Sequence, residues 1–285
     1  MQLAYGLVFC ILPILLLPFY LRIIYIFITT PKYRKLECYR IMAQIGVVQC
    51  VSTAPCYVVL GVAQILNHDP FYIASTLMKL LPAGLKMEAW FSLVLALNRM
   101  KIICGLRYHS FVHTMLILLT WILGIAYFGI LITPCCEYGI AVGHYIGKYD
   151  ISIPSGRTLI SITSYLLLVP LFLTLFVYII ILGYHIRLKF IFGSSIATKD
   201  KPILIYALSR FLVDFTLGML YFSGLPHSSA FDFAESVGYI LSNLILSPII
   251  YLMFNKSMRK AFLPCKQKSF VNAIVVTKSV SRNMK

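Results

Sequence analysis

Seven long apolar runs constrain the fold of this 285-residue chain more than any other feature of its sequence. A helix needs about 20 apolar residues to cross the hydrocarbon core of a bilayer. The runs lie at residues 3–29, 41–66, 76–98, 113–134, 158–184, 203–225 and 233–254. Each is continuously apolar rather than alternating, so it predicts a helix and not a barrel strand. We therefore predict an all-α membrane protein, a seven-transmembrane helical bundle. The short gap between the last two runs leaves a count of six as the alternative.

The charges agree with this prediction and give it an orientation. Charged residues make up 12% of the chain, whereas a soluble domain carries about 25%. The net charge of +16 comes mainly from basic residues that follow the first, third, fifth and seventh runs, as in cytosolic loops. We expect the N-terminus outside, the C-terminus in the cytosol and no nucleic-acid partner, with Asp69, Asp232 and Glu235 on the outer side. The basic residues include Lys32, Arg34, Lys35, Arg40, Arg99, Lys101, Arg107, Arg187, Lys189, Lys256, Arg259 and Lys260.

Nothing in the sequence indicates an enzyme. The eight cysteines show no paired C-x₂-C spacing of the kind that holds zinc. We find no nucleophile paired with a base, and no set of metal-ligating residues. We therefore expect no catalytic residues, no metal and no cofactor.

Two of the apolar runs carry a basic and an acidic residue close together: Lys86 and Glu88 in the third, Arg210 and Asp214 in the sixth. An unpaired charge near the bilayer centre costs at least about 2.5–3.5 kcal/mol. Arg210 and Asp214 are four residues apart, so they share a helical face and can pair. Three interpretations stay open. The charges form ion pairs that only neutralise each other, or a polar network between the third and sixth helices that rearranges with the bundle, or a path for a proton or solute.

Motifs at the ends of two runs resemble a known family. Arg99 closes the third run, and the seventh ends with Ser247-Pro248-Ile249-Ile250-Tyr251 before a basic stretch. Their order and placement resemble the rhodopsin-like G-protein-coupled receptors. Together with Glu37-Cys38-Tyr39-Arg40-Ile41-Met42 and Leu95-Ala96-Leu97-Asn98-Arg99, they resemble most closely the nematode serpentine chemoreceptors of class T.

The resemblance implies a multi-pass receptor of the plasma membrane, often in the cilia of sensory neurons, that couples to a heterotrimeric G protein. Arg99 would fill the arginine position of the family's third-helix motif. Ser247, Pro248 and Tyr251 would fill its asparagine-proline-tyrosine motif, with serine in place of asparagine. The sequence also departs from the family at Asn98, where an acid is usual, and at Gln49, where many members have an aspartate. The seventh run holds no lysine, which excludes the retinal Schiff base of an opsin.

We predict a ligand site in the outer half of the bundle and a switch with a G-protein face below it. Residues 1–254 would form the transmembrane domain, 255–265 a short basic amphipathic helix at the membrane surface, and 266–285 a disordered cytosolic tail. Cys265 is a candidate for palmitoylation. The expected ligand residues are Lys79, Lys86, Glu88, Trp90, Asp214, Tyr221 and Tyr239. The expected switch residues are Arg99, Arg210, Asn243, Ser247, Pro248 and Tyr251.

The function that follows is a chemosensory G-protein-coupled receptor that binds a small molecule and activates a heterotrimeric G protein. The alternative is a small multispan transporter that uses Glu88, Arg210 and Asp214 to carry a solute or a proton. The expected partners are a small-molecule ligand, a G protein and the lipid bilayer.

Overall fold

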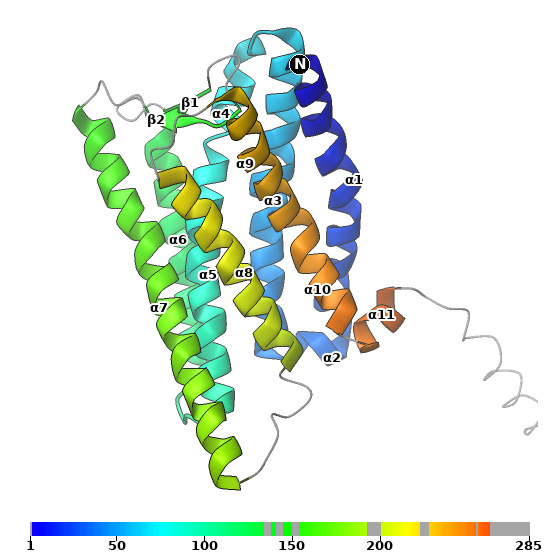
Figure 1. Ribbon diagram of the computed structural model, residues 1–285, viewed down its shortest axis with the longest axis vertical. Helices are drawn as coiled ribbons and strands as arrows, with labels where there is room; N and C mark the ends of the chain where they lie inside the picture. Colours follow the sequence, from blue (N-terminus) through cyan, green and yellow to red (C-terminus); the bar gives the residue numbers. More distant parts are fainter. Residues whose placement is uncertain are drawn as a thin grey trace, which may run out of the picture.

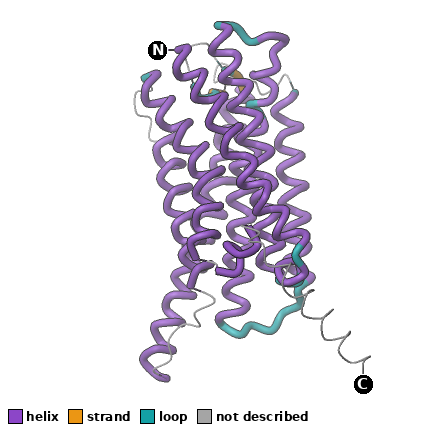
Figure 2. Tube along the Cα trace, turned by 90° about the vertical axis from the view of Figure 1, so that its right-hand side faces the viewer, coloured by secondary structure: helices purple, strands orange, loops and turns teal. Residues whose placement is uncertain are grey.

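Long helices run side by side along the length of the molecule in the computed structural model (Figure 1, Figure 2). The structure describes residues 2–133, 138–140, 145–149, 154–192, 201–222, 228–254 and 256–262. The chain has the predicted seven-helix bundle, and the six-helix alternative is wrong because α8 ends at Phe222 and α9 begins at Ser229. The helices are α1 (Gln2–Thr29), α3 (Glu37–Leu66), α5 (Leu80–Ile103), α6 (Phe111–Ile132), α7 (Pro154–Phe192), α8 (Lys201–Phe222) and a seventh made of α9 (Ser229–Leu241), η2 (Ser242–Leu246) and α10 (Ser247–Phe254).

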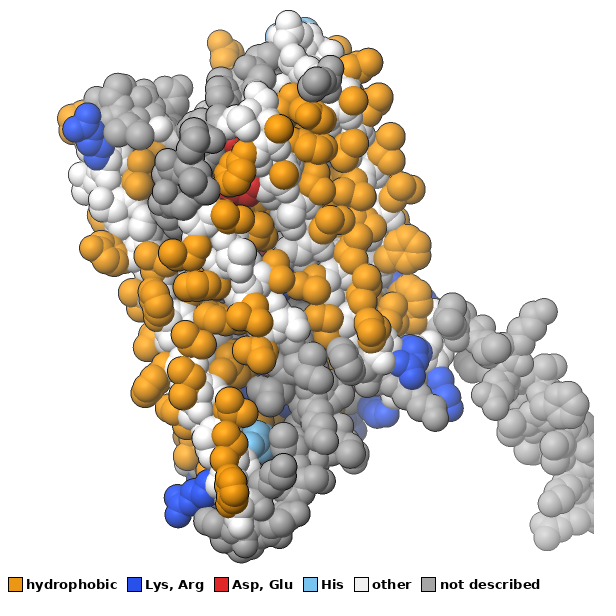
Figure 3. Space-filling view, in the orientation of Figure 1, with side chains coloured by type: hydrophobic (Ala, Val, Ile, Leu, Met, Phe, Trp, Pro, Cys, Tyr) orange, Lys and Arg blue, Asp and Glu red, His pale blue; other side chains and the backbone are white. Residues whose placement is uncertain are grey.

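The outer surface of the bundle is suited to lipid. Six helical segments of the described chain, all but α8, are long and apolar enough to cross a membrane. The 22 residues of α8 include Arg210 and Asp214, and at 1.5 Å per residue they still span about 33 Å. Apolar side chains cover much of the side of the bundle in the face shown in Figure 3. Large exposed side chains such as Ile122 and Phe176 belong to this surface.

Short elements close the two ends of the bundle. At the end where the chain begins lie η1 (Pro70–Tyr72), α4 (Ile73–Leu77) and a hairpin of β1 (Tyr138–Gly139) and β2 (Lys148–Tyr149) (Figure 1). The strands are antiparallel, with Tyr138 opposite Tyr149. At the other end, α2 (Pro31–Arg34) lies near α11 (Lys256–Phe262), and the Lys32 ammonium donates to the Ser257 hydroxyl over 2.9 Å. The predicted lipidation site Cys265 and the predicted tail, 266–285, lie outside the described residues.

The centre of the bundle is formed by α3 and α5, which bury most of their surface, whereas α1, α6 and α7 turn most of theirs outward. Close packing of α1 on α3 depends on two glycines. A Cβ atom on Gly61 would lie 2.6 Å from the carbonyl oxygen of Gly6, closer than any real contact. Small residues allow this kind of backbone approach between helices in membranes.

The seventh helix changes its winding near its middle. Residues Ser242–Leu246 form a π-helical turn directly before Ser247 and Pro248. Proline has no N–H to donate to the carbonyl four residues earlier, here that of Leu244. Inserted π turns are frequent at functional sites, and this one was not predicted from the sequence.

Candidate functional site

Arg210 is the centre of a buried polar network. Its side chain projects from α8 and is only 4% exposed. Nε donates to Oδ2 of Asp214 over 2.8 Å, as the four-residue spacing predicts. Nη1 donates to the carbonyl oxygen and the hydroxyl of Ser242, at 2.7 and 2.8 Å. Nη2 donates to Oδ1 of Asn243 over 2.6 Å and forms an ion pair with Glu88 of α5. A guanidinium has five N–H donors, and each of these five contacts can take one.

The network continues into α3 and α1. Asn243 donates from Nδ2 to the Thr53 hydroxyl over 2.8 Å. Gln49 donates from Nε2 to Oε2 of Glu88 over 3.4 Å, and its own Oε1 accepts from the Tyr20 hydroxyl at 2.5 Å. The Ser247 hydroxyl also lies within reach of Gln49, at 3.4 Å. Side chains from α1, α3, α5, α8 and the seventh helix therefore meet in one connected cluster, which we call the Arg210 network.

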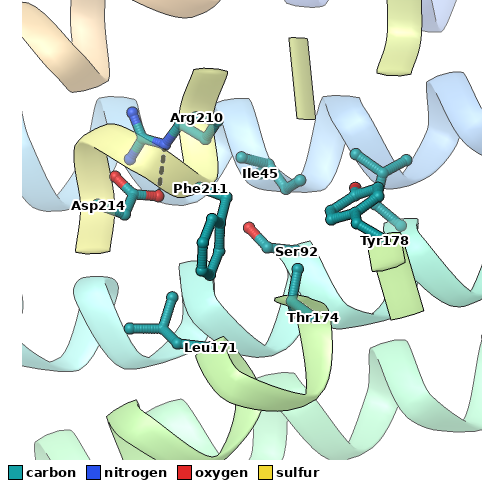
Figure 4. Close-up of a pocket in the computed structure, with 9 residues that line it drawn as sticks. Ile45, Ser92, Leu171, Thr174, Tyr178, Arg210, Phe211 and Asp214 are labelled. Carbon is teal, nitrogen blue, oxygen red and sulfur yellow. Dashed lines mark hydrogen bonds and ion pairs between the residues drawn. The ribbon is translucent and has the colours of Figure 1, made fainter. Parts of the chain in front are cut away.

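A narrow cavity adjoins this network between α5, α7 and α8. Arg210 and Asp214 line it from α8, with Phe211 beside them (Figure 4). Ser92 of α5 and Thr174 of α7 supply hydroxyl groups on the other walls. The Thr174 hydroxyl is already bonded to the Pro170 carbonyl over 2.7 Å, within its own helix.

A second polar cluster lies at the end of the bundle predicted to be cytosolic. Asn98 of α5 donates from Nδ2 to Oε2 of Glu37 over 2.8 Å. Nδ1 of His113 in α6 lies 3.1 Å from the other carboxylate oxygen of Glu37. The Tyr108 hydroxyl lies 3.0 Å from Nε2 of His113, and burial together with the charge of Glu37 raises the pKa of Tyr108. Glu37 of α3 thus links α5 and α6 at this end of the bundle. Arg99, next to this cluster in sequence, is 4% exposed.

The residues predicted to bind ligand do not meet in one cavity of the described structure. Glu88 and Asp214 belong to the Arg210 network. Lys86 and Trp90 line a separate cavity between α5, α6 and α7. Lys79 precedes α5 at its outer end, Tyr239 is buried in α9, and the side chain of Tyr221 lies outside the described residues.

The predicted switch residues of the seventh helix lie on its inward face. Asn243 and Ser247 are fully buried in the Arg210 network. Pro248 follows the π turn. Tyr251 is 6% exposed and packs edge-on against Phe27 of α1, with ring centroids 5.3 Å apart.

Several members of these clusters were missed by the sequence analysis. Gln49 was not among the predicted ligand or switch residues, yet it links α3 to three other helices, and its depth within an apolar run was the available signal. Tyr20 and Glu37 gave no signal, because their partners lie 29 and 61 positions away. Asp232 and Glu235 were expected only to lie on the outer side; both are in α9 and are 0% and 4% exposed, so they are buried in the bundle rather than exposed at its surface. Among the described residues, no group of His, Cys, Asp and Glu has the arrangement to hold a metal.

Comparison with known proteins identifies the fold. No family model and no curated protein matches the sequence. The crystal structure of squid rhodopsin is similar, with a TM-score of 0.70 over 91% of this chain and 83% of that chain at 13% identity. Such a likeness at low identity shows a shared fold, so the rhodopsin-like architecture expected from the motifs is confirmed. The closer resemblance to nematode class T chemoreceptors stays a prediction, as does the orientation of the termini.

Proposed function

We propose that this chain is a G-protein-coupled receptor of the plasma membrane that binds a small molecule in the outer half of its bundle. Binding would shift the bundle toward a form open at the cytosolic face, where a heterotrimeric G protein is activated. A chemosensory role, in the cilia of sensory neurons, is the part of the proposal that rests on the sequence resemblance alone. The observation that carries the proposal is the single guanidinium of Arg210, which ties α8 to α5 and to the seventh helix.

A switch needs an element with two discrete arrangements. Within the described residues, α8 packs much less extensively on its neighbours than α1 does on α3. Its backbone lies close to that of α5 at few places, and the two helices are joined by the Glu88–Arg210 ion pair and by an apolar cluster that includes Ala89 and Phe211. Moving α8 away from α5 would break that pair while leaving the Arg210–Asp214 pair, which lies within α8, intact. The network therefore supports a resting state that a ligand can release.

The same geometry argues against Arg210 as the group that carries a solute or a proton. A carrying group must offer free hydrogen-bond donors or acceptors and then release what it binds. Each contact made by Arg210 instead ends on a group of the protein itself. Arg210 is also almost fully buried.

We expect Arg99 to act on the G-protein side. It lies 11 positions after Glu88 in the same helix, which is about 16 Å along the axis. Its burial in the resting form fits a group that becomes accessible only when the bundle opens below the Arg210 network.

Heterologous expression with a panel of small water-soluble and volatile compounds tests the proposal, with a G-protein-dependent signal as readout. Arg99→Ala is expected to abolish the signal at unchanged surface expression. Arg107→Ala is the matched control, because Arg107 is exposed between α5 and α6, and it is expected to retain the signal. Solute flux that persists without any G protein, and that both variants retain, would support a transporter instead.

A further inference from the structure

Lys86 is a half-buried cation without an acidic partner among the described residues. Its ammonium lies 3.3 Å from the Pro82 carbonyl oxygen of its own helix and 4.5 Å from the ring centroid of Tyr127 in α6. No carboxylate of the described residues lies within ion-pair distance of it. Glu88 cannot serve, because residues two apart on a helix point to nearly opposite sides, about 160° apart, and Glu88 is engaged by Arg210. A lone cation in a spanning helix is costly and marks a functional site by default.

The ammonium borders a small cavity with a mostly apolar lining. Trp90 of α5, Leu123 and Gly124 of α6, and Leu166 of α7 contribute to its walls. The backbone of α6 approaches α5 closely here, since a Cβ atom on Gly124 would lie 2.2 Å from the sulfur of Met87. A cation at one end of an apolar space is complementary to an anion that carries an alkyl chain.

The cavity is covered toward the outer end of the bundle and less closed toward its side. The Tyr127 hydroxyl is hydrogen-bonded to that of Tyr149 in β2 at 2.5 Å, and Tyr149 packs edge-on against Tyr138. By contrast, α6 and α7 each pack on α5 and make few or no backbone contacts with each other among the described residues. Leu123 and Leu166 are only half-buried on these two helices. The accessible approach therefore runs from the lipid-facing side, between α6 and α7.

We propose that this cavity is the binding site for an anionic amphiphile that enters from the bilayer between α6 and α7. The anionic group, a carboxylate or a phosphate, would bind the Lys86 ammonium, and the alkyl chain would lie along Leu123 and Leu166. The proposal names the ligand class for the outer-half site. That the bound amphiphile triggers signalling rests on the proposed function, whereas binding of the amphiphile does not.

The chain contains a built-in reporter for this site. Trp90 lines the cavity. The only other tryptophan, Trp121, is not among the lining residues but lies next to Thr120, which is, and donates from Nε1 to Gln44 over 3.1 Å. In a Trp121→Phe background, the fluorescence of purified protein in phosphatidylcholine nanodiscs comes from Trp90 alone. A fatty acid brominated along its chain quenches a tryptophan that it touches.

Titration with the brominated acid is expected to give saturable quenching, and its methyl ester only the weak linear quenching of lipid partition. Lys86→Met is expected to weaken the apparent affinity for the acid at least tenfold, and Lys86→Arg to retain most of it. Lys101→Met, the same change near the other end of α5, is the control and is expected to leave the affinity unchanged. Equal quenching by acid and ester would overturn the proposal even if Lys86→Met failed to fold, and so would an unchanged affinity in a folded Lys86→Met protein.

A brominated phosphatidic acid in a parallel titration separates the two sources of such an anion. Saturation by the free acid alone assigns a fatty acid, and saturation by the phospholipid assigns a headgroup phosphate; both support the site, and saturation by neither refutes it. The assay contains no G protein. The absence of saturable quenching would therefore refute the binding site without refuting the receptor proposal. Saturable quenching in a protein that activates no G protein would support the binding site and refute the receptor proposal.

Discussion

Replacing Glu88 with Gln is the substitution that most directly tests the Arg210 network as a switch. The change keeps the shape of the side chain and leaves an amide oxygen, in the place of Oε2, able to accept from Arg210, but it removes the negative charge. Oε1 of Glu88 makes no hydrogen bond in the structure, so the new NH₂ group can take its place without displacing a contact. The substitution therefore weakens the tie between α5 and α8 selectively.

The size of the effect follows from the kind of bond that is lost. The substituted pair loses the attraction between opposite charges but keeps a hydrogen bond with a charged donor, so only part of the about 1.5–3 kcal/mol that such a bond contributes is lost. A loss of about 1–2 kcal/mol changes an equilibrium by a factor of about 5–30. A receptor that is about 1% open at rest would then be about 5% to 23% open without ligand. Glu88→Gln is thus expected to raise basal signalling several-fold.

Basal G-protein activation, normalised to surface expression, measures this shift. Asp214→Asn is the matched control, because it also removes one carboxylate charge from Arg210 but acts on a contact within α8. It is expected to raise basal activity much less than Glu88→Gln. Equal effects of the two substitutions, or a fall in basal activity with Glu88→Gln, would show that the charges only neutralise each other and would refute the switch.

Two further predictions concern stability. Gly61→Val forces a side chain against the backbone of Gly6 and is expected to destabilise the bundle by about 1–3 kcal/mol, measured as a lower thermal unfolding temperature in detergent. Gly129→Val is the control and should leave that temperature nearly unchanged, because a Cβ atom there meets nothing within 4 Å. Similar unfolding temperatures for the two variants would contradict the close approach of α1 and α3. Asp69 accepts from the backbone N–H groups of Ala74 and Ser75 at 2.9 and 2.8 Å. Burial alone would raise the pKa of Asp69, but these bonds and that from the Ser75 hydroxyl outweigh it and lower the pKa below its ordinary value of 3.8. The stabilisation is therefore present above pH 3.8 and lost as the pH falls through the lower value in the folded protein. Asp69→Ala should lower the free energy of unfolding by about 0.5–2 kcal/mol at neutral pH, as for a helix cap. The difference in unfolding temperature between the wild type and Asp69→Ala should narrow at pH 3, and a difference that stayed the same would count against this.

The architecture was readable from the sequence because its signal is local. Membrane length and continuous apolarity belong to each run separately, and transfer into lipid acts on each run by itself. This is why seven helices could be predicted, and why Arg210 and Asp214, four positions apart on one helix, could be paired in advance. The motifs at Arg99 and at Ser247-Pro248 extended the prediction to the rhodopsin-like fold, which the likeness to squid rhodopsin confirms.

The partners of the buried polar groups were decided only by the packing of the helices. Lys86 and Glu88 are close in sequence but lie on nearly opposite faces of α5. Lys86 therefore lines the cavity beside α6, whereas Glu88 contacts Arg210, 122 positions away. Gln49, Thr53 and Asn243 likewise found partners that no spacing within a run could indicate. In lipid, helix association depends on small residues and close contact rather than on apolar pattern, and glycines such as Gly6 and Gly61 set those contacts one by one. The sequence by itself determined which residues enter the membrane, and the tertiary structure decided which of them meet.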